Sequence, residues 1–190
     1  MDKPYLLVVT GRPGAGKTTF AQALGQEICM PVISRDQIKE GYVRTFGKKH
    51  TELGPDTNLR ATEIFFDTLM GLVDSGVSVV AEAAFQHRLW SERLAPFMDK
   101  ARIVMLICTV DGEVALQRFV QRGLHDPRRE YFHGDKGVDM ARRGIALEVS
   151  PYEEPHLDLP VFHSDTSGEY VPSVAELAAE ILGGEWASHI

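Results

Sequence analysis

The segment Gly11–Thr18 reads GRPGAGKT, and it determines which fold the chain is expected to adopt. It matches the pattern G-x-x-x-x-G-K-[ST], a glycine-rich turn that follows a strand and opens a helix. The apolar run YLLVVT at Tyr5–Thr10 directly precedes the turn, and the helix-compatible run TTFAQALGQEI continues from its last residue. Motif and context therefore predict a strand, a turn and a helix in direct succession.

The fixed positions of this loop are typical of a site for a nucleoside triphosphate. Glycines let backbone N–H groups turn toward phosphate oxygens, and the following helix adds its positive N-terminal end. Lys17 is expected to reach the β- and γ-phosphates, and the Thr18 hydroxyl to bind Mg²⁺. A glycine turn that binds nothing is the alternative. The predicted nucleotide contacts in the loop are Gly11, Arg12, Pro13, Gly14, Ala15, Gly16, Lys17, Thr18 and Thr19.

The composition describes one ordinary domain over residues 1–190. Its 20 Lys and Arg stand against 27 Asp and Glu, which gives a formal net charge of −7. With 44% hydrophobic and 25% charged residues, the chain falls outside the disordered and fibrous classes. The negative charge disfavours indiscriminate binding to nucleic acids or anionic membranes.

The cysteines and apolar runs indicate a reduced, cytoplasmic protein. Cys29 and Cys108 form no CxxC pair and the seven histidines are dispersed, which argues against a zinc site or a disulfide framework. The longest apolar run, Ile103–Val110, is far shorter than the roughly 20 residues that cross a bilayer. The first apolar stretch runs straight into the glycine loop, so it is interpreted as a strand and not as a signal peptide. The oligomeric state stays open.

Short β-branched and aliphatic runs alternate with helical patterns, which predicts parallel strands joined by crossover helices. The last helix has its apolar stripe from Val174 to Leu182. Residues 123–137 are rich in charge and glycine, and we expect them to form a mobile lid. The expected strands are Tyr5–Thr10, Pro31–Ser34, Val77–Ala81, Ile103–Thr109 and Val161–His163.

Other classes of phosphate-loop protein fit less well. A GTPase switch would need an [NT]-K-x-D segment, which the sequence lacks, and the D-x-x-G at Asp165–Gly168 comes too late in the chain. Motor ATPases usually need a larger helical lid or partner subunits, for which 190 residues leave little room. A small kinase remains.

Further segments accompany the loop in a characteristic order, and with them the chain resembles the P-loop small kinases that include polynucleotide 5'-hydroxyl kinases, zeta-toxin-like kinases and antibiotic phosphotransferases. The resemblance covers nearly the whole chain. It implies an α/β, doubly wound parallel sheet of order 2-3-1-4-5 with helices on both faces, and ATP and Mg²⁺ as cofactors. The segments are SRDQIK at Ser34–Lys39, VVAEAAF at Val79–Phe85, QRFVQR at Gln117–Arg122 and HSDTS at His163–Ser167.

The resemblance also implies a catalytic set. Asp36 matches the acid that faces the acceptor hydroxyl, and an N-terminal capping box from Ser34 is the alternative reason for an acid at this position. Arg118 and Arg122 lie about 40° apart on one helix face and are implied to contact ATP phosphates together with Lys17. Ordinary surface arginines are the alternative there.

Glu82 and two basic stretches are the candidates for the acceptor side. Glu82 closes the third expected strand and is implied to hold a magnesium-bound water or to shape the acceptor pocket, with simple solvent exposure as the alternative. Residues 35–50 carry a local charge of +3 and residues 117–136 one of +2. An acceptor with negative charge is therefore expected, with Lys39 and Arg44 among its contacts; a set of solvated charges is the alternative. The roles of Arg128 and Arg129 stay open.

Two neighbouring aromatic residues belong to the expected core. Phe65 and Phe66 are expected to pack there, with the lining of the acceptor pocket as the alternative for one of them. No histidine is expected to be catalytic. The core stripe expected beside these rings is Leu59, Thr62, Leu69 and Val73.

The sequence therefore predicts MgATP-dependent phosphorylation of a hydroxyl on a small molecule, which is anionic or resembles a nucleoside or sugar. One alternative is a kinase of nucleic-acid 5' ends, a partner that is possible but less favoured. The other is a nucleotide-dependent switch or ATPase that transfers phosphate only to water.

Overall fold

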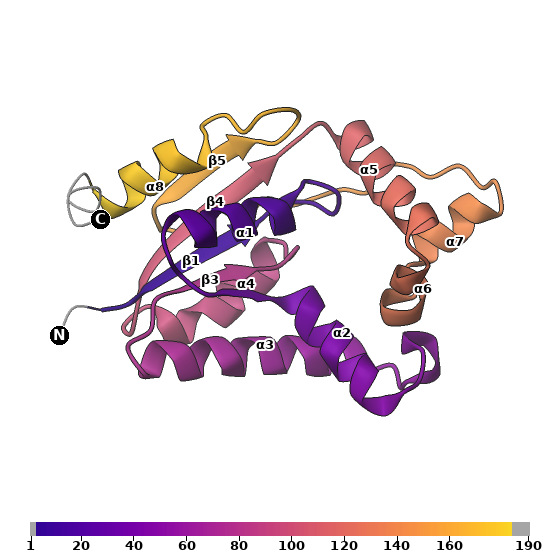
Figure 1. Ribbon diagram of the computed structural model, residues 1–190, viewed down its shortest axis with the longest axis horizontal. Coiled ribbons are helices and arrows are strands. Elements are labelled where there is room, and N and C mark those ends of the chain that lie inside the picture. The colour runs from indigo at the N-terminus through magenta and orange to yellow at the C-terminus, as the bar shows by residue number, and fades with distance from the viewer. Residues whose placement is uncertain (1–2, 184–190) are drawn as a thin grey trace.

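A computed structural model describes residues 3–183 of the chain as a five-stranded parallel sheet flanked by helices (Figure 1). The strand order is β2-β3-β1-β4-β5, as expected. Among the described residues, no helix combines the length and apolar character needed to span a bilayer. The elements in chain order are β1 (Tyr5–Thr10), α1 (Lys17–Glu27), β2 (Val32–Ser34), α2 (Arg35–Phe46), η1 (His50–Glu52), α3 (Thr57–Asp74), β3 (Val79–Glu82), α4 (His87–Leu94), η2 (Ala95–Phe97), β4 (Arg102–Thr109), α5 (Gly112–His125), α6 (Pro127–His133), α7 (Lys136–Arg142), β5 (Val161–Asp165) and α8 (Val174–Leu182).

Each of the five expected strands is present; β1 has the expected bounds, and the ends of the other four differ from the expected ones by at most two residues. The central strand β1 pairs with β3 on one side and β4 on the other, so that Leu6 lies beside both Val79 and Ile103. Because all strands are parallel, their carboxyl ends meet at one edge of the sheet. The turns that leave β1, β2 and β3 therefore share this edge.

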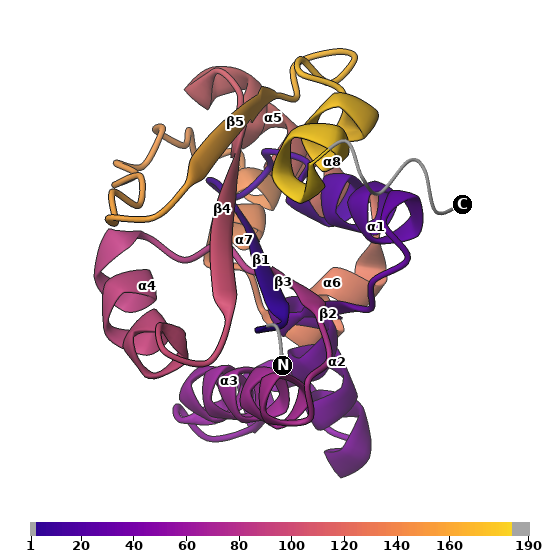
Figure 2. The ribbon, with the colours of Figure 1, turned by 90° about the vertical axis from the view of Figure 1, so that its left-hand side faces the viewer.

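The alternation of side chains along β1 divides the core into two layers. Leu6 and Val8 point into the cluster built with α3 and α4, whereas Leu7 and Val9 point into the cluster built with α1 and α8. Figure 2 shows these helix pairs on opposite faces of the sheet. All four β1 side chains are fully buried, which explains why the strand is apolar throughout.

The helix α3 supplies the aromatic part of the first layer. Phe65 and Phe66 are both buried there, so core packing is confirmed for the pair. Both rings make edge-to-face contacts with the Trp90 ring, with interplanar angles of 62° for Phe65 and 83° for Phe66. The expectation for Leu59 is wrong: this side chain is 53% exposed, because the helix turns it away from the sheet.

The segment expected to be a lid is helical. Residues 123–137 span the end of α5, all of α6 and the start of α7. Figure 1 shows α5, α6 and α7 extending beyond the carboxyl ends of the strands. The side chains of Asp111 and Asp126 accept hydrogen bonds from backbone N–H groups at the starts of α5 and α6, which explains helix formation in such polar sequence.

Replacing Phe65 by alanine should destabilise the protein by about 3–5 kcal/mol, because the truncation leaves a cavity in a core that cannot fully collapse. Leu59→Ala on the same helix should change the free energy of unfolding by less than about 0.5 kcal/mol. Urea denaturation of the two variants measures both values. Equal losses in both variants would contradict the placement of α3.

Candidate active site

The phosphate loop has the backbone shape that exposes its N–H groups. Gly14 and Gly16 have φ angles of +86° and +74°, which side-chain-bearing residues rarely adopt. A Cβ atom at Gly14 would also clash with the backbone carbonyl of Ala115. No side chain caps the start of α1, so its first N–H groups are left for a ligand. The Lys17 ammonium donates to the Arg12 carbonyl at 2.9 Å inside the loop.

The loop opens into a cavity of about 490 Å³ that also contains most of the predicted site. The cavity collects residues from the turns after β1, β2 and β3 and from the helices of the lid region. Of the predicted site residues, it is lined by Pro13, Gly14, Gly16, Lys17, Thr18, Thr19, Asp36, Lys39, Glu82 and Arg122.

Glu82 lies at the bottom of the cavity, where β3 ends. Only 4% of its surface is exposed, so the alternative of simple solvent exposure is wrong. Ser34 donates to the Glu82 Oε2 atom at 2.6 Å, and no side chain caps α2. The capping box that was the alternative reason for an acid at position 36 is therefore absent, because the hydroxyl bonds to the neighbouring strand. Burial raises the pKa of Glu82, although Ser34, Lys17 and Thr18 partly offset the effect.

Lys17 lies close to the Glu82 carboxylate and is itself buried, with 7% of its surface exposed. Burial lowers the pKa of Lys17, and the negative field of Glu82 acts against that shift. The charge of each group thus opposes the pKa shift that burial causes in the other. The pair lies where the phosphate chain of a nucleotide is expected.

Asp36 lies in the first turn of α2, with half of its side chain exposed to the cavity. Enclosure by the cavity walls raises the pKa of Asp36, but the fields of His133, Arg35 and further cations outweigh this effect and hold the pKa below its ordinary value. The Arg35 guanidinium contacts the Asp36 carboxylate at 3.3 Å. Asp36 is therefore a carboxylate at neutral pH.

Lys39 lies one helical turn beyond Asp36 and is 4% exposed. Its ammonium donates to the His133 carbonyl of α6 at 3.3 Å. Burial lowers the pKa of Lys39 to about 8. A lysine in this setting gains strongly from an anion that enters the cavity, because its ammonium is poorly solvated.

Several cavity residues were missed by the sequence analysis, which assigned no role to any histidine. His50 and Arg129 each have a buried nitrogen without a hydrogen-bond partner in the described chain, Nδ1 and Nε respectively. The only signal for them was their place in the two basic stretches. Arg129, whose role the sequence left open, lines the cavity, and the missed lining residues include Arg35, His50, Asn58, Phe119, His133, Asp135 and Lys136.

Other predicted site residues lie outside the cavity lining. Arg118 donates to the carbonyls of Thr166 and Ser167 at 2.9 and 2.7 Å, so it does not lie beside Arg122 at the cavity. Arg44 lies over the Phe132 ring in a neighbouring hollow.

The remaining loop residues and one lid arginine also lie away from the cavity surface. Arg12 lies over the ring of Tyr152, and Gly11 and Ala15 are buried in the loop. Arg128 is paired with Asp126 at the surface, which distinguishes it from Arg129.

Comparisons with known proteins agree with this architecture. A shikimate kinase of Bacillus cereus is 26% identical over 172 residues, which cover 88% of this chain and 92% of that protein. A solved structure of a candidate kinase from Chloroflexus aurantiacus has a TM-score of 0.75 at 23% identity and covers 95% of this chain and 98% of that chain. A gluconokinase from Sinorhizobium meliloti has a TM-score of 0.58 at 17% identity and covers 100% and 99%.

The family comparison extends over most of the molecule. The model of the AAA domain family matches residues 6–143, from β1 past the end of α7. Together with the strand order and the phosphate loop, this match assigns the chain a kinase-like P-loop fold. The chain is thus a member of the AAA domain family.

Proposed function

We propose that this protein transfers the γ-phosphate of MgATP to a hydroxyl of a small anionic molecule. One observation carries the proposal: a single cavity joins the phosphate loop to Asp36 and to a cationic far wall. Lys17 and Thr18 line this cavity from the phosphate loop and α1, and its cationic wall consists of Arg35, Lys39, His50 and Arg129. A donor nucleotide and an acceptor can therefore bind in one continuous space.

The nucleotide end combines loop N–H groups, the start of α1 and two cations. Lys17 and Arg122 both line the cavity, where they would stabilise the charge that spreads over the transferring phosphoryl group. Arg118, bound to the carbonyls that follow β5, would contribute to the nucleotide site from outside the cavity.

The oxygen atoms of Thr18 and Glu82 suit a magnesium ion. Both side chains line the cavity, and Thr18 lies near enough to the Glu82 carboxylate to lower its pKa. Mg²⁺ prefers hydroxyl, carboxylate and water oxygens, and when bound it would offset phosphate charge. A buried carboxylate with a raised pKa gains from such a cation, which supports a metal role for Glu82.

Asp36 would act mainly by orientation. Its carboxylate accepts the hydrogen bond of the acceptor hydroxyl and aligns the oxygen with the γ-phosphorus. As the new O–P bond forms and the bond to the β-phosphate oxygen breaks, the hydroxyl proton passes to Asp36. A lowered pKa makes Asp36 a weak base, but a loose phosphoryl-transfer transition state needs little early deprotonation.

The far wall supports an acceptor with a carboxylate or phosphate group. Basic side chains outnumber acidic ones along the cavity, and the unpartnered nitrogens of His50 and Arg129 lie at this wall beside Lys39. Arg35 is held there by the carbonyl and side-chain oxygens of Asn58, at 3.0 and 3.2 Å. An anionic group would satisfy these donors, and the small-molecule kinases among the relatives agree with an acceptor of this size.

A panel of acceptors tests the reaction class. ADP release from MgATP should depend on an added hydroxy acid, sugar phosphate or related anion, and should be slow with water alone or with 5'-hydroxyl oligonucleotides. Asp36→Asn should lose transfer about 10²-fold or more while ATP still binds, because the positioned carboxylate is gone. Glu63→Gln, a change at a half-buried position on α3 outside the cavity, is the control. Full transfer by Asp36→Asn would remove this residue from the mechanism.

Lys39→Met should raise KM for the anionic acceptor by about 10-fold or more with a smaller effect on kcat, because a charge-assisted hydrogen bond is lost. Lys48→Met lies in the same basic stretch but outside the cavity, and should behave as wild type. Steady-state kinetics with the acceptor found in the panel measures both. An unchanged KM in Lys39→Met argues against an anion at this wall.

The Lys39 ammonium should titrate with a midpoint near pH 8, below the ordinary lysine value of about 10.4. Its charged form is favoured by a nearby anion, so addition of the acceptor should move the midpoint upward. NMR of the lysine ε-methylene groups, assigned with Lys39→Arg, follows this change. A midpoint that stays constant on saturation with the acceptor would contradict contact between the two.

A further inference from the structure

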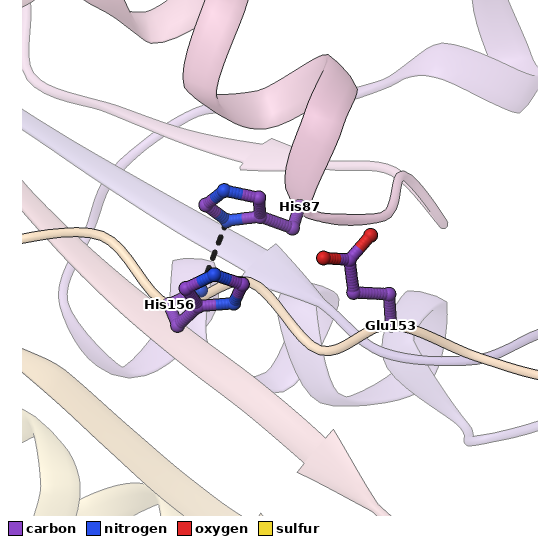
Figure 3. Close-up of side chains that lie close together, drawn as sticks. All are labelled: His87, Glu153 and His156. Atoms are coloured by element: carbon purple, nitrogen blue, oxygen red, sulfur yellow. Dashed lines mark hydrogen bonds between the residues drawn. The ribbon is translucent and has the colours of Figure 1, made fainter.

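We propose that His87, Glu153 and His156 form a binding site for a transition-metal ion of the zinc class, outside the phosphate-transfer cavity. One ligand atom from each residue lies within 4.8 Å of the other two. Figure 3 shows the His87 and His156 side chains together, with the Glu153 carboxylate beside them. The residues come from the start of α4 and from the chain that precedes β5.

The ligand chemistry matches this class of metal. Two imidazoles and a carboxylate are ligands that zinc accepts, and water would complete a four-coordinate site. Ligand atoms around tetrahedral zinc lie about 3.4 Å apart, given bonds of roughly 2.0–2.1 Å. The three side chains are half-buried or exposed, so rotation about their side-chain bonds can close the remaining gap.

The two segments are already held in register before any metal binds. The backbone N–H of His87 donates to the Glu153 carbonyl at 3.3 Å, and the N–H of Glu153 donates to the Gln86 side chain at 3.4 Å. Pro155 is buried, and Leu157 packs against the core. The ligands therefore come from a docked chain, which reduces the ordering required when the ion binds.

The two imidazole rings stack, with centroids 3.6 Å apart and an angle of 8° between their planes. Nitrogen lone pairs lie in the ring planes, so the stack has to open by rotation about the side-chain bonds before both rings face one ion. The Nδ1 atom of His156 lies 3.1 Å from the Glu154 carbonyl, and donation to this oxygen leaves the Nε2 lone pair free. The Nδ1 atom of His87 accepts a long hydrogen bond, 3.3 Å, from the N–H of His156; a metal ion there would replace it.

Local charge favours a cation at this place. The segment EEPHLD at residues 153–158 contains three carboxylates and no basic side chain other than His156. A bound ion would tie this segment to the start of α4, directly after the turn in which Ala83 and Ala84 line the cavity. The dispersed positions of the histidines in the sequence conceal the cluster, because His87 and His156 are brought together only by folding.

Calorimetric titration of the untagged, chelator-treated full chain with ZnCl₂ tests the site. Wild type should bind one equivalent here with a low-micromolar Kd. His87→Ala and His156→Ala should each weaken this binding about 10-fold or more, and Glu153→Gln should weaken it less. His125→Ala, an exposed histidine on α5, is the matched control and should bind as wild type does. A Kd unchanged in both histidine variants, or no binding by wild type below about 1 mM, would overturn the proposal.

Hydrogen exchange gives a readout that is independent of affinity. Saturating Zn²⁺ should slow exchange at the amides of His87 and Glu153, which bond across the two segments, at least several-fold in wild type and not in His156→Ala, since only a bridging ion stabilises the contact between the segments. Equal protection by zinc in wild type and His156→Ala would place the ion elsewhere and refute the site.

Discussion

Glu82 is a carboxylate buried at the end of an apolar strand, and its need for partners organises the site. Burial of such a group is unfavourable unless hydrogen bonds and a cation meet it. Ser34 of β2 donates to it, Thr18 approaches from the start of α1, and Lys17 supplies positive charge. One side chain therefore connects two neighbouring strands and the phosphate loop at the edge of the sheet where the cavity opens.

The second carboxylate of the cavity has the opposite setting. The pKa of Glu82 is raised by burial, whereas the cations around Asp36 hold the pKa of that residue low. The pKa values of two carboxyl groups in one cavity are thus shifted in opposite directions by their surroundings. Glu82 is suited to meet a cation, and Asp36 to accept a hydrogen bond from a neutral hydroxyl.

The strands could be predicted closely because their signals are local, whereas their order in the sheet came from the resemblance to the P-loop small kinases. The loop GRPGAGKT stands between an apolar strand and a helix, and each further strand is a short aliphatic run, so motif and hydrophobic pattern agree. The carboxyl ends of β1, β2 and β3 then had to bring Lys17, Asp36 and Glu82 to one edge. The hydrogen bond of the Ser34 hydroxyl could not be predicted from its neighbours in the sequence, because Ser34 donates across the sheet to Glu82 and does not cap its own helix.

The lid side of the site could not be predicted in the same way. Arg118 and Arg122 are one helical turn apart, yet the carbonyls of Thr166 and Ser167 bind the first, while the second lines the cavity. His50 and Arg129 come from separate segments, and only the packing of α6 on η1 and α2 brings them to the same wall. Such contacts between distant segments leave no periodic trace in the sequence.

The contact between α6 and α2 buries Lys39 at the wall of the cavity where the acceptor is proposed to bind. His133 lies 2.8 Å from the Glu40 carboxylate, and its carbonyl accepts the hydrogen bond of Lys39. Where these helices pack together, the Lys39 ammonium loses contact with water and gains a hydrogen bond to the His133 carbonyl, and burial lowers its pKa to about 8. When they pack over an anion, the same burial strengthens the attraction. On the proposed function, the packing of α6 on α2 would therefore be most favourable with the acceptor inside.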